Sequence, residues 1–141
     1  FVYLLDLFPT ICQLAGAEIP RPAEGKSLVP VIRSERENVR NCIFMAYRTC
    51  QRAVRTDRWK LIRYPEVDKT QLFDLQKDPH ERENLSDLPE YADKVKELMA
   101  LLKKTQKEFA DNAPLTVSNP KPAAWTAPAA ADKPRRKGKK Q

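Results

Sequence analysis

Residues 42–75 carry the pattern that decides the fold, and they read CIFMAYRTCQRAVRTDRWKLIRYPEVDKTQLFDL. Four short runs in this stretch are apolar and aromatic or alternate between apolar and polar side chains, which is typical of β-strands. The runs cover residues 42–47, 52–56, 59–64 and 71–75. Because the links between them are short, neighbouring strands are expected to pair as an antiparallel meander. The sequence therefore predicts a small antiparallel sheet of three to four strands.

A long amphipathic helix is expected after the sheet. Apolar residues recur at three- and four-residue steps between positions 88 and 109, and most lysines lie off that stripe. Pro89 fits the first turn of a helix, and Ser86 or Asp87 can cap it. The pattern predicts a helix over residues 89–110, about 33 Å long, which is enough to cover one face of the sheet. The predicted fold class is therefore α+β.

The residues before the sheet predict helices and loops. Asp6 precedes an apolar pattern with Pro9 in its first turn, so its carboxylate is expected to cap a helix over residues 7–15. Gly16 is a suitable left-handed stop for that helix, and residues 28–32 predict one more helical turn. The first residues are apolar without a polar lead-in, which favours a piece of a longer chain over a processed terminus.

The positive charge is concentrated at the end of the chain. The 141 residues carry a formal net charge of +7, of which +5 lies in residues 132–141. Residues 112–141 are rich in proline and alanine without periodicity, and they are expected to form a disordered basic tail. The remainder is close to neutral, which disfavours a uniformly basic nucleic-acid-binding domain. No apolar run approaches the roughly 20 residues of a membrane-spanning helix, so no membrane partner is expected.

Few residues in the sequence suggest catalysis or metal binding. His80 is the only histidine and lies in a predicted turn, where a solvated side chain is the usual case. The cysteines lack metal-ligand spacing; Cys12 and Cys42 are expected in the core and Cys50 in a turn. Four carboxylates lie close together but do not match a calcium loop, so turn and capping roles are favoured. Those carboxylates are Asp74, Asp78, Glu81 and Glu83.

Basic and aromatic residues alternate through the predicted sheet. One interpretation is an anion-binding surface for phosphate, sulfate or nucleic acid. The other, which the spacing alone favours, is a solvated outer face whose cations pair with Asp57 and Glu66. The basic residues are Arg48, Arg52, Arg55, Arg58, Lys60 and Arg63, and the aromatic ones are Tyr47, Trp59 and Tyr64.

Three segments, followed by the long helix, resemble a known family when taken in order. They are residues 6–32 (DLFPTICQLAGAEIPRPAEGKSLVPVI), 52–64 (RAVRTDRWKLIRY) and 71–89 (QLFDLQKDPHERENLSDLP). They resemble the C-terminal subdomain of the formylglycine-dependent type I sulfatases, in the alkaline-phosphatase-like superfamily. The resemblance implies three parts. Residues 1–41 would end the catalytic α/β domain, residues 42–111 would form the C-terminal subdomain, and residues 112–141 the tail.

This resemblance implies an enzyme that hydrolyses aryl or carbohydrate sulfate esters, with a sulfated small molecule or glycan as substrate. In that family a formylglycine, made from a C/S-x-P/A-x-R signature, and Ca²⁺ lie in the N-terminal domain. No cysteine of this chain is followed by that signature. The chain is therefore expected to be a C-terminal fragment, inactive alone and packed on the missing catalytic domain. Many family members are exported, so a periplasmic or extracellular parent is expected.

The resemblance also implies a substrate-facing position for the end of the first strand. In the family this strand and its loop approach the active-site cleft, and here they correspond to residues 47–52. Arg48, Gln51 and Arg52 are therefore predicted to line a substrate subsite, with no catalytic or metal-binding residue in this chain. The alternative is a free-standing α+β interaction module whose basic tail binds nucleic acid or another anionic surface.

Overall fold

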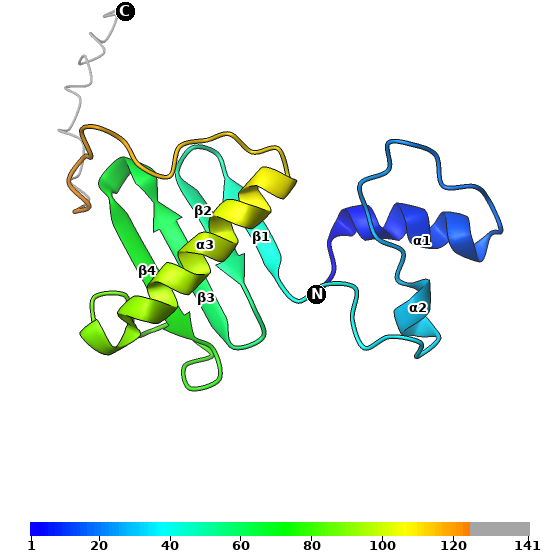
Figure 1. Cartoon of the computed structure of the whole chain (residues 1–141), viewed down its shortest axis with the longest axis horizontal. Coiled ribbons are helices and arrows are strands. Elements are labelled where there is room, and N and C mark those ends of the chain that lie inside the picture. The colour runs from blue at the N-terminus through cyan, green and yellow to red at the C-terminus, as the bar shows by residue number, and fades with distance from the viewer. Residues whose placement is uncertain (125–141) are drawn as a thin grey trace, which may run out of the picture.

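The computed structural model describes residues 1–124. A four-stranded sheet and one long helix form its larger part, and two short helices lie to one side (Figure 1). This arrangement confirms the predicted α+β sheet with its covering helix. The elements are α1 (Leu7–Leu14), α2 (Val29–Ile32), β1 (Ile43–Tyr47), β2 (Gln51–Arg55), β3 (Trp59–Tyr64), β4 (Lys69–Asp74) and α3 (Ala92–Glu108), with 3₁₀ turns at Leu4–Asp6, Pro65–Val67 and Pro89–Tyr91.

The strands form an antiparallel meander in the order β1-β2-β3-β4. Their register places Phe44, Val54, Leu61 and Leu72 in one row across the sheet. Strand β3 has the predicted bounds, whereas β4 begins two residues earlier than expected, at Lys69. The earlier start arises because the tight turn after β3 returns the chain at once and pairs the last residue of β3 with the first of β4.

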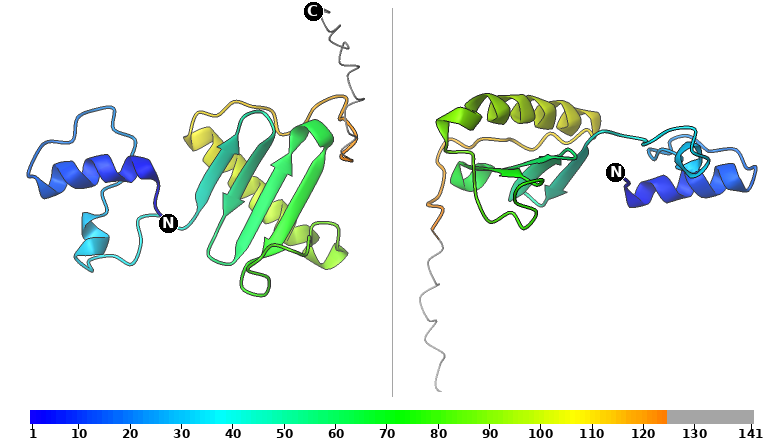
Figure 2. Two further views of the ribbon diagram at one scale, coloured as in Figure 1. Left: turned by 180° about the vertical axis from the view of Figure 1, so that it is seen from behind. Right: turned by 90° about the horizontal axis from the view of Figure 1, so that it is seen from below.

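Helix α3 lies across one face of the sheet (Figures 1 and 2). Its Leu98 and Leu102 are buried against the apolar row of the sheet and form the main core. The helix is shorter than predicted, because its first turn is 3₁₀ and Ala110 adopts a left-handed conformation at its end. The predicted side-chain cap is wrong: Ser86 donates its hydroxyl to the carbonyl oxygen of Thr70 at 2.8 Å.

Both outer edges of the sheet have hydrogen-bond partners. At the β4 edge, the amide of Leu72 donates to the Asn84 side chain, and the amide of Leu85 donates to the Leu72 carbonyl, each at 2.9 Å. At the β1 edge, the Tyr3 hydroxyl accepts from the amide of Phe44 at 2.5 Å and donates to its carbonyl at 3.1 Å. These contacts occupy backbone groups that an open sheet edge leaves free.

Asp6 does not cap α1, contrary to the prediction, although its carboxylate does cap the 3₁₀ turn at Leu4–Asp6. It already has helical backbone angles, so its side chain turns inward, where it is 0 % exposed. The carboxylate accepts from the amides of Tyr3 and Lys26 at 2.7 and 2.8 Å, and from both terminal nitrogens of Arg40. Burial acts to raise the pKa of Asp6, but these hydrogen bonds outweigh it and lower the pKa to about 2. A buried ion pair thus joins α1 to the residues before β1.

The chain after α3 is held against the sheet as far as residue 121. Leu115 packs on the main core, and its carbonyl accepts from Arg63 Nε at 2.8 Å. The amide of Lys121 donates to the Glu66 carbonyl at 2.7 Å. The sequence predicted disorder from residue 112 onward, whereas this segment is ordered as far as residue 121. It is ordered because the buried Arg63 donates a hydrogen bond to its backbone. Residues 125–141, with the basic stretch 132–141, lie outside the described part of the chain, and the domain boundaries stay predictions.

The apolar stripe of α1 points away from the rest of the chain. Leu7, Ile11 and Leu14 follow one helical face and are largely exposed, with Ile11 at 64 %. The opposite side of the helix, with Pro9 and Thr10, is buried instead. Figure 2 shows α1 well separated from the sheet and α3. Within residues 1–124, no helix has the length and hydrophobicity needed to cross a membrane.

Candidate functional site

The connection between β1 and β2 carries the first predicted substrate residue in an uncommon backbone conformation. Arg48 has a φ of 47°, in the left-handed region that residues other than glycine seldom adopt. The amide of Cys50 donates to the Tyr47 carbonyl at 3.1 Å and closes the turn. Thr49 donates its hydroxyl to Glu66 at 2.9 Å. Such a backbone costs on the order of 1 kcal/mol, and it persists where neighbouring contacts impose it.

The three predicted substrate residues do not converge on one point. Arg48 is exposed, and its guanidinium carbon lies 5.6 Å from the centre of the Tyr47 ring. Gln51 and Arg52 are neighbours in β2, so their side chains leave opposite faces of the sheet. Arg52 lies on the face that α3 covers and is only 6 % exposed. The structure therefore places Arg48 toward solvent and Arg52 in the interior, and it leaves substrate contact by any of them untested.

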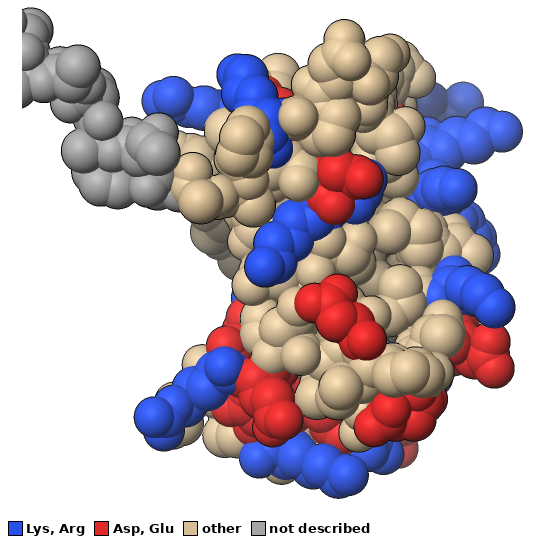
Figure 3. Space-filling view, turned by 90° about the vertical axis from the view of Figure 1, so that its left-hand side faces the viewer, with Lys and Arg blue, Asp and Glu red and all other residues tan. Residues whose placement is uncertain are grey.

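Four of the six cations in the sheet region have carboxylate partners, but the predicted partners are wrong. The pairs are Arg52–Asp111, Arg58–Asp74, Lys60–Glu81 and Arg63–Asp68. Asp57 and Glu66 were expected from their nearness in sequence, whereas strand alternation and the sheet register set which side chains meet. Among residues 1–124, Arg48 and Arg55 have no carboxylate within ion-pair distance. Figure 3 shows that basic and acidic side chains are interspersed on the face it draws.

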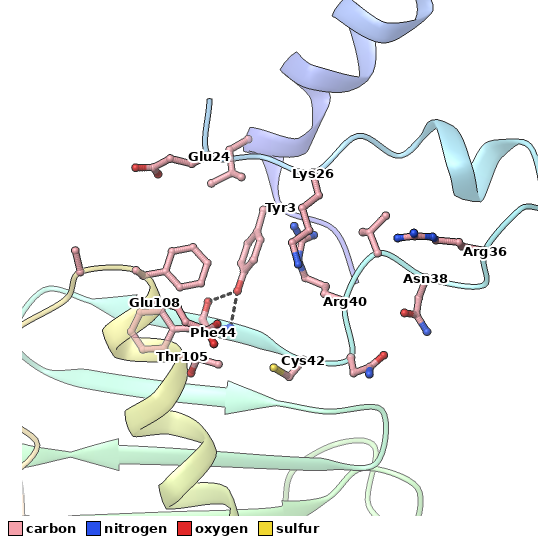
Figure 4. A pocket seen from close by; sticks show the side chains of 15 residues that line it. Tyr3, Glu24, Lys26, Arg36, Asn38, Arg40, Cys42, Phe44, Thr105 and Glu108 are labelled. Carbon is pink, nitrogen blue, oxygen red and sulfur yellow. Dashed lines mark hydrogen bonds between the residues drawn. The ribbon is translucent and has the colours of Figure 1, made fainter. Parts of the chain in front are cut away.

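A cavity of about 750 Å³ lies between the N-terminal segment and the sheet. Figure 4 shows Tyr3 reaching across it to the backbone of Phe44, with Lys26, Arg40 and Cys42 on its walls. Burial raises the pKa of the Cys42 thiol, which keeps it protonated and weakly nucleophilic at neutral pH. None of the three predicted substrate residues lines this cavity. Its walls come from segments far apart in sequence, so no local spacing could have revealed it.

The sequence matches the C-terminal domain of a sulfatase family. The family model described as N-sulphoglucosamine sulphohydrolase, C-terminal, matches residues 1–108, which is most of the chain. The chain belongs to this family. This C-terminal domain has the sheet and covering helix that the sequence pattern predicted.

Two bacterial sulfatases are similar to this sulfatase C-terminal domain. The N-acetylglucosamine-6-O-sulfatase of Bacteroides thetaiotaomicron is 36 % identical over 122 residues, which cover 78 % of this chain and 22 % of that protein. The Delta 4,5-hexuronate-2-O-sulfatase of the same organism is 37 % identical over 106 residues, covering 70 % and 22 %. The chain thus spans about a fifth of the length of these curated relatives.

The fold of this chain also matches part of a solved structure. The structure of BT4656 in complex with its substrate D-glucosamine-2-N,6-O-disulfate superimposes with a TM-score of 0.70 at 34 % identity. The match covers 78 % of this chain and 25 % of that one. The chain is thus similar in both sequence and fold to a protein with a sulfated sugar bound.

The carboxylates of this sulfatase domain are dispersed in structural contacts. Asp74 pairs with Arg58, whose guanidinium holds the pKa of Asp74 below its usual range. Asp78 accepts from the amides of Arg82 and Glu83 at 2.6 and 2.8 Å, which is the predicted turn role. In the described part of the chain, no three histidine, cysteine, aspartate or glutamate side chains are grouped to hold a metal ion.

Proposed function

We propose that this chain is the C-terminal domain of a sulfatase that hydrolyses sulfate esters on sugars. The family match over residues 1–108 carries the proposal, because the family model is that of a sulphohydrolase. Two relatives named as sugar sulfatases, and a related structure with a sulfated glucosamine bound, support a carbohydrate substrate. The proposed substrate class is therefore a sulfated glycan or monosaccharide.

The proposed sulfuric ester chemistry depends on parts of the protein outside this chain. The residues that follow the cysteines read QLAG, IFMA and QRAV, so none fits the signature from which formylglycine is made. No group of side chains within residues 1–124 fits a calcium site either. We place both the formylglycine and Ca²⁺ in the larger N-terminal portion that the relatives have, and we assign no catalytic step to this chain.

The exposed apolar side of α1 is proposed to pack on that N-terminal catalytic domain. Large apolar side chains there are exposed, up to 87 % for Leu4 in the turn before α1, and they recur at helical spacing. Exposed large apolar side chains grouped along one helical face are typical of an interface. The relatives are four to five times longer than the matched region, which supplies a partner of the needed size. The surface comprises Leu4, Leu7, Phe8, Ile11 and Leu14.

Arg48 is the residue of this chain that we propose to contact the substrate. A sulfate ester keeps a negative charge, and a guanidinium is well suited to bind it with two hydrogen bonds. Arg48 is exposed and has no carboxylate partner in the described part of the chain. The adjacent Tyr47 ring is 57 % exposed and offers an apolar surface to a sugar. We expect the sulfate or carboxylate groups of the glycan to meet this arginine.

The test of the proposed activity is release of inorganic sulfate by the whole protein that contains this chain. We expect turnover of 6-O-sulfated N-acetylglucosamine or of a 2-O-sulfated hexuronate. A variant lacking the formylglycine precursor is the control and should release none. If the matured protein, with its formylglycine verified by mass spectrometry, released no sulfate from any sulfated sugar, the proposed function would be wrong.

A further inference from the structure

We infer that the Arg52–Asp111 pair, in which Arg52 is buried and Asp111 partly buried, is a positioning device that holds the β1–β2 turn and thereby the orientation of Arg48. This inference deepens the proposed function and rests on it. Arg52 was predicted to contact substrate directly, and the geometry points to a different role. Its guanidinium acts through the backbone of the turn, so it is a positioning residue.

The guanidinium of Arg52 joins two parts of the chain that are 59 residues apart. Its Nε and Nη2 donate to the two carboxylate oxygens of Asp111, with the Nη2 bond at 3.3 Å. Its Nη1 donates to the carbonyl oxygens of Arg48 and Gln51 at 2.6 and 2.9 Å. One side of the planar group therefore holds a carboxylate, and the other holds the backbone of the turn. A lysine cannot make these four bonds at once, because it lacks the fork.

Asp111 is itself fixed by the end of α3. The amide of Ala110 donates to the carbonyl oxygen of Lys107 at 3.1 Å, and the amide of Asp111 donates to the carbonyl oxygen of Gln106 at 3.0 Å. This pair of hydrogen bonds is a Schellman motif. Asp111 Oδ1 also accepts from the amide of Ala113 at 2.9 Å. The Arg52 guanidinium holds the pKa of Asp111 below its usual range, so the carboxylate is charged at neutral pH. The pair thus ties the turn to the rigid end of a helix.

A second buried arginine lies beside Arg52. Arg52 and Arg63 face each other across β2 and β3, and both are buried under the segment that follows α3. Two buried guanidinium groups side by side repel unless each has its own carboxylate. Asp111 forms an ion pair with Arg52, and Asp68 forms one with Arg63. Moving Arg52 out to a substrate would break its pair with Asp111, whose side chain is only 17 % exposed, and its bonds to the carbonyls of Arg48 and Gln51. This loss favours a fixed role.

The left-handed backbone at Arg48 is the feature that needs this support. A hydrogen bond to the carbonyl of Arg48 acts directly on the strained residue. Without it, the turn could relax to a more common conformation, and the Arg48 side chain would leave the sheet in a different direction. Direction matters for a binding group, because a misplaced cation loses much of its interaction with a bound anion.

The experiment combines amide hydrogen exchange with kinetics in the whole protein. Arg52→Lys is expected to speed exchange at the Cys50 amide about tenfold and to raise KM about fivefold, with kcat within about twofold. In an Arg48→Ala background, the same change should leave KM unaltered. Asp111→Asn should act in the same direction. Arg63→Lys, which alters the adjacent buried arginine, is the matched control and should change neither the Cys50 amide nor KM.

The outcomes separate this inference from the proposed function. Unchanged exchange at Cys50 in both Arg52→Lys and Asp111→Asn would overturn the positioning role. Equal effects of Arg52→Lys on KM with and without Arg48 would also overturn it, because the effect would then not pass through Arg48. A KM unaffected by Arg48→Ala alone would instead reject the proposed substrate contact, whatever the exchange at Cys50 shows.

Discussion

Replacing Arg40 by alanine is expected to lower the free energy of unfolding by about 3 kcal/mol. Arg40 supplies the only side chain that pairs with the Asp6 carboxylate in the described part of the chain, and that carboxylate is fully buried. Removing Arg40 leaves the Asp6 carboxylate without its cation, with two backbone amides as its remaining donors. Urea denaturation followed by circular dichroism measures the change. Arg36→Ala, which removes an exposed arginine nearby, is the control and should change stability little.

The Asp6–Arg40 pair also predicts how the stability depends on pH. The folded pKa of Asp6 is about 2, below its ordinary value of 3.8, so the unfolded chain binds this proton more readily. Its contribution to stability is therefore present above the unfolded pKa and is lost as the pH falls toward 2. In Arg40→Ala this acid-induced loss should shrink. A cost below about 1 kcal/mol for Arg40→Ala at pH 7 would contradict the assigned importance of the pair.

The combined change Leu7→Gln, Ile11→Gln and Leu14→Gln is expected to have opposite effects on the isolated chain and on the whole protein. Glutamine is a good helix former, so α1 itself should persist. In the isolated chain these residues face solvent, and the change should raise solubility. In the whole protein each lost apolar contact is worth about 1.5–3 kcal/mol, so the interface should weaken by about 5 kcal/mol.

The measurement pairs the soluble yield of the isolated chain with the thermal midpoint of the whole protein. The matched control is a triple glutamine change on the exposed lysines of α3, which should lower neither quantity; these are Lys103, Lys104 and Lys107. If the α1 variant left the thermal midpoint of the whole protein unchanged, this side of α1 would not be the interface.

The sheet and its covering helix could be predicted from sequence because both depend on local patterns. Alternation within residues 59–64 sets the two faces of β3, and the structure reproduces that strand as predicted. Prediction was less accurate at the ends of elements, where 3₁₀ turns and left-handed residues such as Ala110 decide the boundary. These conformations depend on only one or two residues, so they produce no periodic signal.

The candidate site was harder to predict because its contacts are distant in sequence. Arg52 pairs with Asp111, which is 59 residues away in the sequence, and Asp6 pairs with Arg40, which is 34 residues away. Local rules assigned Asp6 to the cap of α1 and the sheet cations to nearby carboxylates, and both assignments were wrong. The prediction that the β1–β2 connection lines a substrate subsite came from the family resemblance. The structure adds that Arg48 lies in an exposed left-handed turn, whereas Arg52 is buried in β2.

The proposal that this domain supplies Arg48 to the substrate is tested most directly by the KM of the whole protein for a sulfated sugar. Arg48→Ala is expected to raise KM about tenfold, since one charge-assisted contact is worth roughly 1.4 kcal/mol. Arg33→Ala, which removes an exposed arginine at the end of α2, should leave KM unchanged. Equal KM values for the wild type and Arg48→Ala, with sulfate still released, would contradict the account.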